Sequence, residues 1–164
     1  MRHLWGRINR LFRAMRPEFA KPDDAFAARY LPASEYKIYA NMDARDREHA
    51  VRVAQFLLTQ KPNASPILLR AALLHDCGKQ VRPYRWRERV WAGLQPIPKL
   101  DFDNAMKKKR PLNALEVRAL HPQLGARLVL GAGGDPRVAQ IIERHHNPQD
   151  DADAAWIHAV DESE

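Results

Sequence analysis

The sequence predicts an all-α fold, and three observations lead to this prediction. Apolar residues recur three or four positions apart along nearly the whole chain, as they do on one face of a helix. No stretch alternates apolar and polar residues with the period of two that a half-buried strand requires. Capping residues and prolines recur at intervals typical of helix starts and ends. The length of 164 residues suits one domain with one appendage.

The first expected element is a basic amphipathic helix over residues 4–15, with apolar side chains on one face and arginines on the other. Pro17 interrupts it. Its apolar face suits docking onto the domain, while residues 2–16 also suit binding to an anionic membrane surface. Contact with nucleic acid and a cleaved targeting role stay open. We expect residues 1–42 to form an N-terminal helical extension and residues 43–164 to form the main domain.

Three further helices are expected in the first part of the chain. A short helix stops before Pro32, and Ser34 is placed to cap the next helix near residues 35–42. Asp43 or Asp46 then caps a longer amphipathic helix. Together these signals predict three consecutive helices joined by short turns.

The next helix begins with Ser65 as its cap and Pro66 in its first position. We expect Gly78 to end this helix in a left-handed conformation, because glycine adopts that conformation at low cost. Residues 80–111 then form an irregular insertion and a possible lid, with one short amphipathic helix. The cationic run at residues 107–110 is expected in a loop or a mobile insertion.

The last part of the chain contains three more helix signals. A helix resumes near Ala114, and His121-Pro122 predicts a break with Pro122 opening the following helix. Asp135-Pro136 repeats the start signal of a cap followed by proline. A final apolar stretch predicts a helix that reaches the end of the sequence.

Composition narrows the classes of protein to which the chain can belong. Cys77 is the only cysteine, which excludes an internal disulfide framework. No apolar run approaches about 18 residues, so no transmembrane helix is expected and we predict a cytoplasmic protein. The net charge of +7 favours anionic partners. These include phosphate-containing small molecules, membrane surfaces and nucleic acid, of which nucleic acid is not the favoured one.

Histidines and acidic residues gather at the ends of the predicted helices. A lone histidine on an apolar face is usually a satisfied core residue, but several imidazoles buried beside carboxylates would be costly without compensation. A divalent cation satisfies them together. Nitrogen and oxygen ligands without a thiolate suit Fe, Mn, Zn, Ni or Co. The candidate residues come from five helical segments and are His49, His75, Asp76, His121, His145, His146 and Asp161.

The order of these residues resembles the HD-domain superfamily of metal-dependent phosphohydrolases. The stretch ALLHDCGK at residues 72–79 is similar to the central signature of that family, and the resemblance spans about residues 43–161. His121 and His145 resemble the extra histidines of the two-metal branches, which include the HD-GYP proteins and the diadenosine-tetraphosphate hydrolases. No GYP motif follows, so hydrolysis of cyclic di-GMP is not implied.

The resemblance implies an HD-domain-like helical bundle with two divalent transition metal ions, Fe or Mn first and Zn, Ni or Co as alternatives. It assigns one ion to four residues: His49, His75, Asp76 and Asp161. It assigns the second ion to Asp76, His121 and His145, with Asp76 bridging the ions and serving as the catalytic residue. Lys79 would contact phosphate, and His146 would be a ligand or a substrate-binding group.

The resemblance therefore predicts hydrolysis of a nucleotide or other small phosphate ester by a water that two ions activate. Two alternatives stay open. The chain would otherwise be a non-catalytic HD module that binds a phosphorylated ligand or a partner, or a helical nucleic-acid-binding protein with structural histidines.

Overall fold

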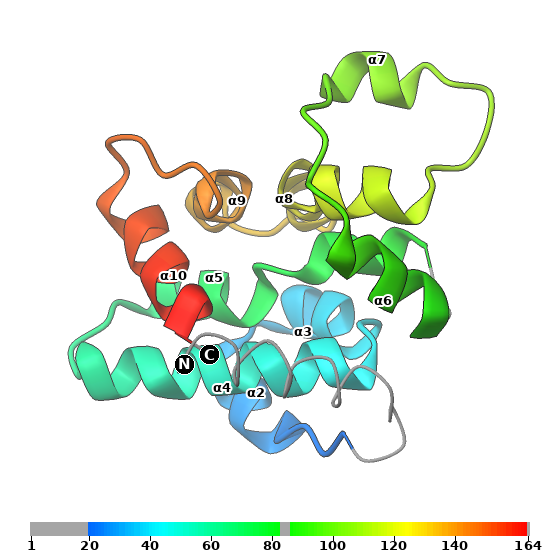
Figure 1. Cartoon of the computed structure of the whole chain (residues 1–164). Helices are drawn as coiled ribbons and strands as arrows, with labels where there is room; N and C mark the ends of the chain where they lie inside the picture. The colour runs from blue at the N-terminus through cyan, green and yellow to red at the C-terminus, as the bar shows by residue number, and fades with distance from the viewer. Residues whose placement is uncertain (1–19, 83–85, 164) are drawn as a thin grey trace, which may run out of the picture.

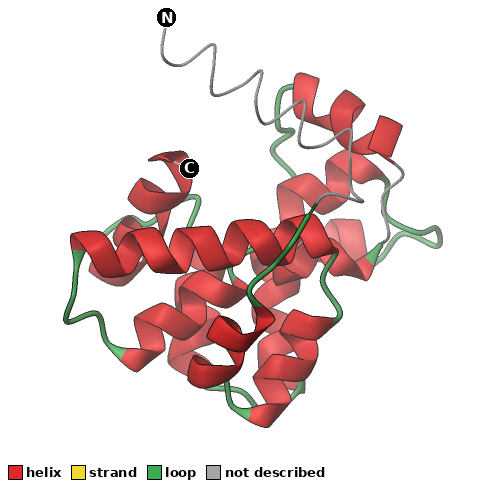
Figure 2. Ribbon diagram, turned by 90° about the horizontal axis from the view of Figure 1, so that it is seen from below, coloured by secondary structure: helices red, strands yellow, loops and turns green. Residues whose placement is uncertain are grey.

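A computed structural model of the chain describes residues 20–82 and 86–163. Within these residues every regular element is helical and no strand occurs, which confirms the all-α fold class (Figure 2). The predicted helix at residues 4–15 lies outside the described residues. The elements are α2 (Asp24–Tyr30), α3 (Ala33–Ala40), α4 (Ala44–Gln60), α5 (Pro66–Leu74), the 3-10 helix η2 (Cys77–Val81), α6 (Trp86–Leu94), α7 (Phe102–Met106), α8 (Ala114–Gly131), α9 (Pro136–Arg144) and α10 (Ala152–Ser163).

Three of the predicted helix starts are confirmed by their capping hydrogen bonds. The side chains of Asp43, Ser65 and Asp135 each accept a hydrogen bond from a backbone N–H in the first turn of α4, α5 and α9. The prediction for Ser34 is wrong. Helix α3 begins at Ala33 directly after Pro32, so Ser34 already lies inside its first turn.

Helix α5 lies at the centre of the fold. Figure 1 shows α4 below it, α8 and α9 above it, and α10 across one end, while α6 and α7 lie on the side away from α10. The residues from Ala71 to Gly78 are all buried, because helices cover this segment on every side. The main core also includes side chains of α2 and α3, such as Phe26 and Tyr39. Within the described residues, no helix combines the length and apolar character needed to cross a bilayer.

Gly78 does not end α5, contrary to the prediction. The helix already ends at Leu74, and Gly78 lies within η2 without a left-handed conformation. The reason for a glycine here is the close approach of η2 to α8. A Cβ atom on Gly78 would lie 2.0 Å from the carbonyl oxygen of His121 and 2.7 Å from the backbone nitrogen of Gly125. Only a residue without a side chain allows the two backbones to come this close.

Pro122 does not break the chain into two helices, so this prediction is also wrong. Helix α8 continues from Ala114 to Gly131 with Pro122 in its interior. A proline there removes one backbone hydrogen bond but does not force the helix to end when the freed carbonyl finds another donor. The imidazole of His121 provides that donor, because its Nδ1 lies 2.8 Å from the carbonyl oxygen of Arg118.

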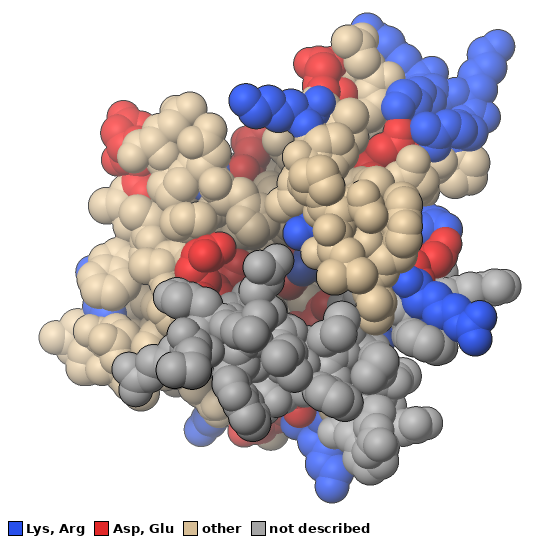
Figure 3. Space-filling model, viewed as in Figure 1, with Lys and Arg blue, Asp and Glu red and all other residues tan. Residues whose placement is uncertain are grey.

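The insertion at residues 80–111 is more ordered than expected. It contains α6 as predicted, and also α7, whose cap Asp101 accepts a hydrogen bond from Asn104 N. Figure 3 shows Lys and Arg side chains gathered over α7 and the loop after it. The cationic run at residues 107–110 lies in a loop, as predicted, and two of its members form ion pairs. Lys108 and Arg110 hold the buried carboxylate of Glu116 at 2.5 Å and 2.8 Å, which ties the run to the first turn of α8.

Substituting Gly78 by alanine tests the close approach of η2 and α8. The new methyl group overlaps backbone atoms that have no room to move, so we expect the free energy of unfolding to fall by about 3 kcal/mol or more. Gly93→Ala is the matched control, because nothing lies within 4 Å of a Cβ atom at this helical position. We expect it to raise stability by up to about 1 kcal/mol. Urea unfolding followed by circular dichroism measures both values, and equal stabilities would contradict the close approach.

The ion pairs of Glu116 predict a specific dependence of stability on pH. Hydrogen bonds from Arg110 and Lys108 lower the pKa of Glu116 to about 2, against burial, which raises it. Since the pKa is lower in the folded chain, this contribution to stability is present above about pH 4.5 and is lost as the pH falls towards 2. We expect Glu116→Gln to lose less stability than the wild type between about pH 5 and pH 2.5.

The measurement is the urea midpoint at these two pH values. Asp103→Asn is the matched control, because Asp103 is a highly exposed carboxylate whose distance to the exposed Arg127 is 3.6 Å. Exposed pairs of this kind contribute little to stability, so the control should follow the wild type. Parallel pH profiles of Glu116→Gln and the wild type would contradict the prediction.

Candidate metal centre

The seven candidate residues meet in one region because several helices end or pass there. His49 lies on α4 and Asp161 on α10, so these two residues are far apart in the sequence. His75 is the C-cap of α5 and Asp76 follows it, while His145 is the C-cap of α9 and His146 follows it. His121 reaches the same region from the middle of α8. The structure therefore brings together every histidine and aspartate that the sequence singled out as a candidate ligand.

Three buried imidazoles share one orientation. The Nδ1 atom of each lies within hydrogen-bonding distance of the main-chain carbonyl three residues earlier. The pairs are His75 with Ala72 at 2.9 Å, His121 with Arg118 at 2.8 Å, and His145 with Ile142 at 2.7 Å. A carbonyl only accepts, so Nδ1 must carry a proton in each ring. Nε2 is then the atom that faces the site, and in a neutral ring it presents a lone pair.

These Nε2 atoms decide whether the residues fit a metal ion. Within the described residues, the Nε2 atoms of His75, His121 and His145 are buried and make no hydrogen bond. Leaving a buried polar atom unpartnered costs about 1–3 kcal/mol, and three such atoms lie close together here. Histidines that bind metals have this arrangement, with one nitrogen held by a carbonyl and the other free for the ion. The donor set therefore fits divalent transition metal ions.

The first group of ligand atoms lies between α4, the end of α5 and α10. His49 Nε2 is 2.8 Å from Asp161 Oδ1, and His75 Nε2 is 3.6 Å both from that oxygen and from Asp76 Oδ2. Ligands that share one ion at about 2.1 Å lie about 3.0–3.4 Å apart. The observed distances scatter around these values, so these four side chains can surround one ion after small adjustments.

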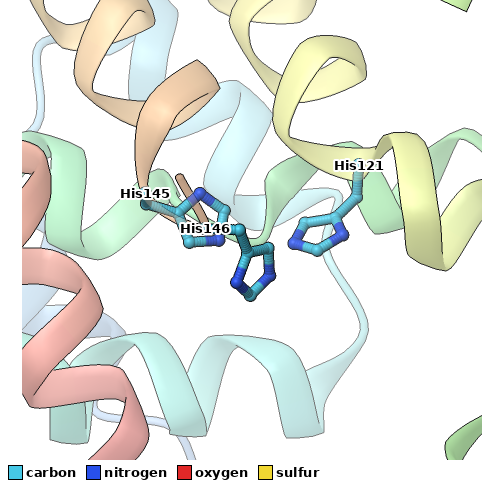
Figure 4. Close-up of side chains that lie close together, drawn as sticks. All are labelled: His121, His145 and His146. Atoms are coloured by element: carbon cyan, nitrogen blue, oxygen red, sulfur yellow. The ribbon is translucent and has the colours of Figure 1, made fainter. Parts of the chain in front are cut away.

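The second group consists of His121, His145 and His146, and Figure 4 shows their rings converging from α8 and from the end of α9. A ligand nitrogen of each lies within 4.8 Å of the others. The ring centroids of His145 and His146 are 4.1 Å apart, and those of His121 and His146 are 5.0 Å apart. His146 thus lies with the ligand candidates of the second group. The sequence had left its role open between ligand and substrate-binding group.

Asp76 lies between the two groups and turns one oxygen towards each. Its Oδ1 is 3.2 Å from Nε2 of His121, whereas its Oδ2 is 3.6 Å from Nε2 of His75. A carboxylate in this position can bind one ion through each oxygen. The arrangement supports two neighbouring ions with Asp76 as their shared ligand.

The electrostatics of the first group favour positive charge. Burial alone would raise the pKa of Asp161, but the hydrogen bond from His49 and the nearby imidazole of His75 hold it well below its usual range. Burial likewise opposes ionisation of Asp76, yet Lys79 and His75 hold its pKa far below the ordinary value. Against burial, the two carboxylates raise the pKa of His75 to about 9. Two buried carboxylates that stabilise the protonated imidazole of His75 this strongly also favour a metal cation in its place.

The second group is different, because two of its imidazoles, those of His145 and His146, are held neutral. Burial and the neighbouring His121 and His75 hold the pKa of His145 well below its usual value. His146 keeps part of its surface exposed, and burial of the rest together with His121 lowers its pKa to about 4. Neutral imidazoles offer lone pairs at neutral pH without first losing a proton. The first group thus contains two ionised carboxylates, whereas the second contains two neutral imidazoles.

Other polar groups of the site were not found from the sequence. The carbonyls of Ala72, Arg118 and Ile142 have no sequence signal of their own. Each belongs to the residue three positions before a histidine that ends a helix or is followed by a proline. Arg52 lies one turn after His49, with Nη2 3.5 Å from its Nδ1. Lys79, which was expected to contact phosphate, lies 2.6 Å from Asp76 Oδ2. It is therefore at the edge of the site.

Comparison with known proteins agrees with this geometry. The family model of the HD domain matches residues 47–162, which includes all the candidate ligands. The chain belongs to the HD-domain family. No curated protein and no solved structure matches it. HD domains typically bind divalent metals, and many are hydrolases, so the donor groups described above lie in a fold that commonly carries such ions.

Metal content tests the site directly. We expect the protein, loaded anaerobically with Mn²⁺ or Fe²⁺, to hold about two equivalents, since Asp76 separates two donor groups. Asp76→Asn keeps the shape of the side chain but removes its charge, and we expect it to lose most of the bound metal. His158→Ala is the control, because His158 lies on α10 outside both donor groups. Elemental analysis measures the content, and wild-type protein without metal after loading would overturn the site.

Proposed function

We propose that this HD-domain protein is a metal-dependent phosphohydrolase that acts on a nucleotide or another small phosphate ester. The observation that supports the proposal most strongly is the pair of donor groups on either side of Asp76, with three buried Nε2 atoms that make no hydrogen bond. Two divalent ions bound between these groups would accept the lone pairs of the donor nitrogens. Fe and Mn suit this mixture of nitrogen and oxygen donors, and Zn, Ni and Co are alternatives.

Each residue of the two donor groups has a role in the proposed reaction. His49, His75, Asp76 and Asp161 would hold one ion, and Asp76, His121 and His145 the other, with His146 beside them. Two bound ions supply a water activated at neutral pH and positive charge for the phosphoryl oxygens. The main-chain carbonyls behind the histidines fix the direction of each Nε2 before any ligand arrives. This preorganisation reduces the cost of assembling the site during a reaction.

Lys79 supports a phosphate-containing substrate. Its ammonium group is half-buried at the edge of the site and donates to Asp76 Oδ2. From the same position it can donate to an oxygen of a bound phosphate group. Lysine provides a compact charge for this purpose. The cations at residues 82–89 and 107–110 would attract an anionic substrate, although Arg82, Lys108 and Arg110 also form ion pairs with neighbouring glutamates.

The proposal is tested by hydrolysis assays on the Mn²⁺- or Fe²⁺-loaded protein. The panel contains 4-nitrophenyl phosphate, bis(4-nitrophenyl) phosphate, nucleoside phosphates and dinucleoside polyphosphates. We expect turnover of at least one member, and its loss in Asp76→Asn. Lys79→Met should lower kcat/KM about ten- to a hundredfold, which corresponds to a charged hydrogen bond of about 1.5–3 kcal/mol.

Two results would contradict the proposal and point to the alternatives. Full metal content without turnover of any phosphoester would indicate a non-catalytic HD module that binds a phosphorylated ligand. Salt-dependent binding of DNA or RNA that persists in His75→Ala would indicate a nucleic-acid-binding role instead.

A further inference from the structure

Pro122 occupies an unusual position for a proline. It is buried in the interior of α8, eight residues after the start of that helix at Ala114. A proline at such a position lacks the N–H of a normal helical residue, and its ring crowds the carbonyl four residues earlier. It therefore lowers the stability of the helix, and we ask which other interaction the proline makes possible.

The carbonyl four residues before Pro122 is that of Arg118. This is the oxygen to which the Nδ1 of His121 donates at 2.8 Å. In an uninterrupted helix the N–H of residue 122 would occupy this acceptor. Proline leaves the acceptor to the imidazole, and the ring of His121 then points its buried Nε2 towards Asp76, 3.2 Å away.

The other two fixed imidazoles obtain their carbonyls in a different way. Ala72 and Ile142 lie in the last turns of α5 and α9, which end at Leu74 and Arg144. The last carbonyls of a helix have no helical N–H to accept, so a side chain can use them. His121 lies in the middle of a helix, where the same geometry needs another means of releasing a carbonyl.

We infer that Pro122 is a positioning residue for the metal centre. It keeps the Arg118 carbonyl available to His121 and so fixes the Nε2 of His121 as a ligand for the second ion. The inference rests on the proposed function in that it takes the two donor groups to be metal sites. It assigns to Pro122 a role that acts through His121 and not through contact with the ion or the substrate.

Restoring an N–H at residue 122 should weaken the second site selectively. In Pro122→Ala the new N–H competes for the Arg118 carbonyl, so His121 loses the partner that fixes its tautomer. We expect the affinity of the weaker Mn²⁺ site to fall about ten- to a hundredfold, as when other groups that orient metal-ligating histidines are removed. Pro122→Val also restores the N–H while keeping more of the buried volume, which separates this effect from a loss of packing.

The matched control is Pro136→Ala. Pro136 is exposed and occupies the first position of α9, where a helix does not use the N–H of the residue. This variant should bind Mn²⁺ as the wild type does. Titration with Mn²⁺, followed by electron paramagnetic resonance, measures both affinities in the full-length chain. Long-range ¹H–¹⁵N spectra of the metal-free protein at pH 8 report which nitrogen of His121 carries the proton.

We expect the wild type and Pro136→Ala to show His121 protonated on Nδ1, and both Pro122 variants to show a mixture of tautomers and a weakened second site. Unchanged Mn²⁺ affinities and an unchanged tautomer in the Pro122 variants would overturn the inference and leave Pro122 as a packing residue. A wild type that binds no Mn²⁺ would overturn the proposed function instead. The tautomer spectra would then still decide the role of Pro122.

Discussion

The candidate metal centre depends on hydrogen bonds from imidazole Nδ1 atoms to main-chain carbonyls. In His75, His121 and His145 this bond joins residues three positions apart, so the side chain and the carbonyl belong to the same turn. Each bond determines which nitrogen carries the proton and in which direction the other nitrogen points. The ligand atoms therefore face a common region as soon as the three helix segments are packed together. The rest of the fold serves to bring these segments into contact.

Packing of the three segments depends on small residues where backbones meet. Gly78 and Gly125 allow η2 and α8 to approach closely, which places Asp76 next to His121. The segment before Asp76 is entirely buried, so its position is determined by neighbours on all sides. Buried ion pairs add further constraints. Glu35, which is fully buried, holds Arg70 of α5 through two hydrogen bonds and thereby joins α3 to the centre of the fold.

The two halves of the centre differ in charge, and this difference bears on the chemistry. Asp76 and Asp161 give the first group negative charge, whereas His145 and His146 are held neutral in the second group. A cation in the first group is stabilised by Coulomb attraction, whereas one in the second group relies on nitrogen lone pairs and on the shared carboxylate. Asp76 is thus the residue on which both halves depend. Lys79 beside it introduces positive charge at the position where an anionic substrate would arrive.

The helical class, most helix starts and the set of candidate ligands could be predicted from the amino-acid sequence alone. Periodicity and caps such as Ser65 and Asp135 act within one or two turns, so they can be recognised without the fold. The order of the histidines and aspartates was sufficient to indicate the family, which the match over residues 47–162 confirmed.

The physical reasons for Gly78 and Pro122 become apparent only once the helices are packed together. The need for glycine arises from the backbone of α8, which is distant in sequence, and the freed carbonyl before Pro122 finds its partner through the orientation of His121. The place of His146 beside His121 and His145 likewise follows from distances that only the packed helices define. Local propensities do not predict these distances, because the distances depend on how helices that are far apart in the sequence pack against one another.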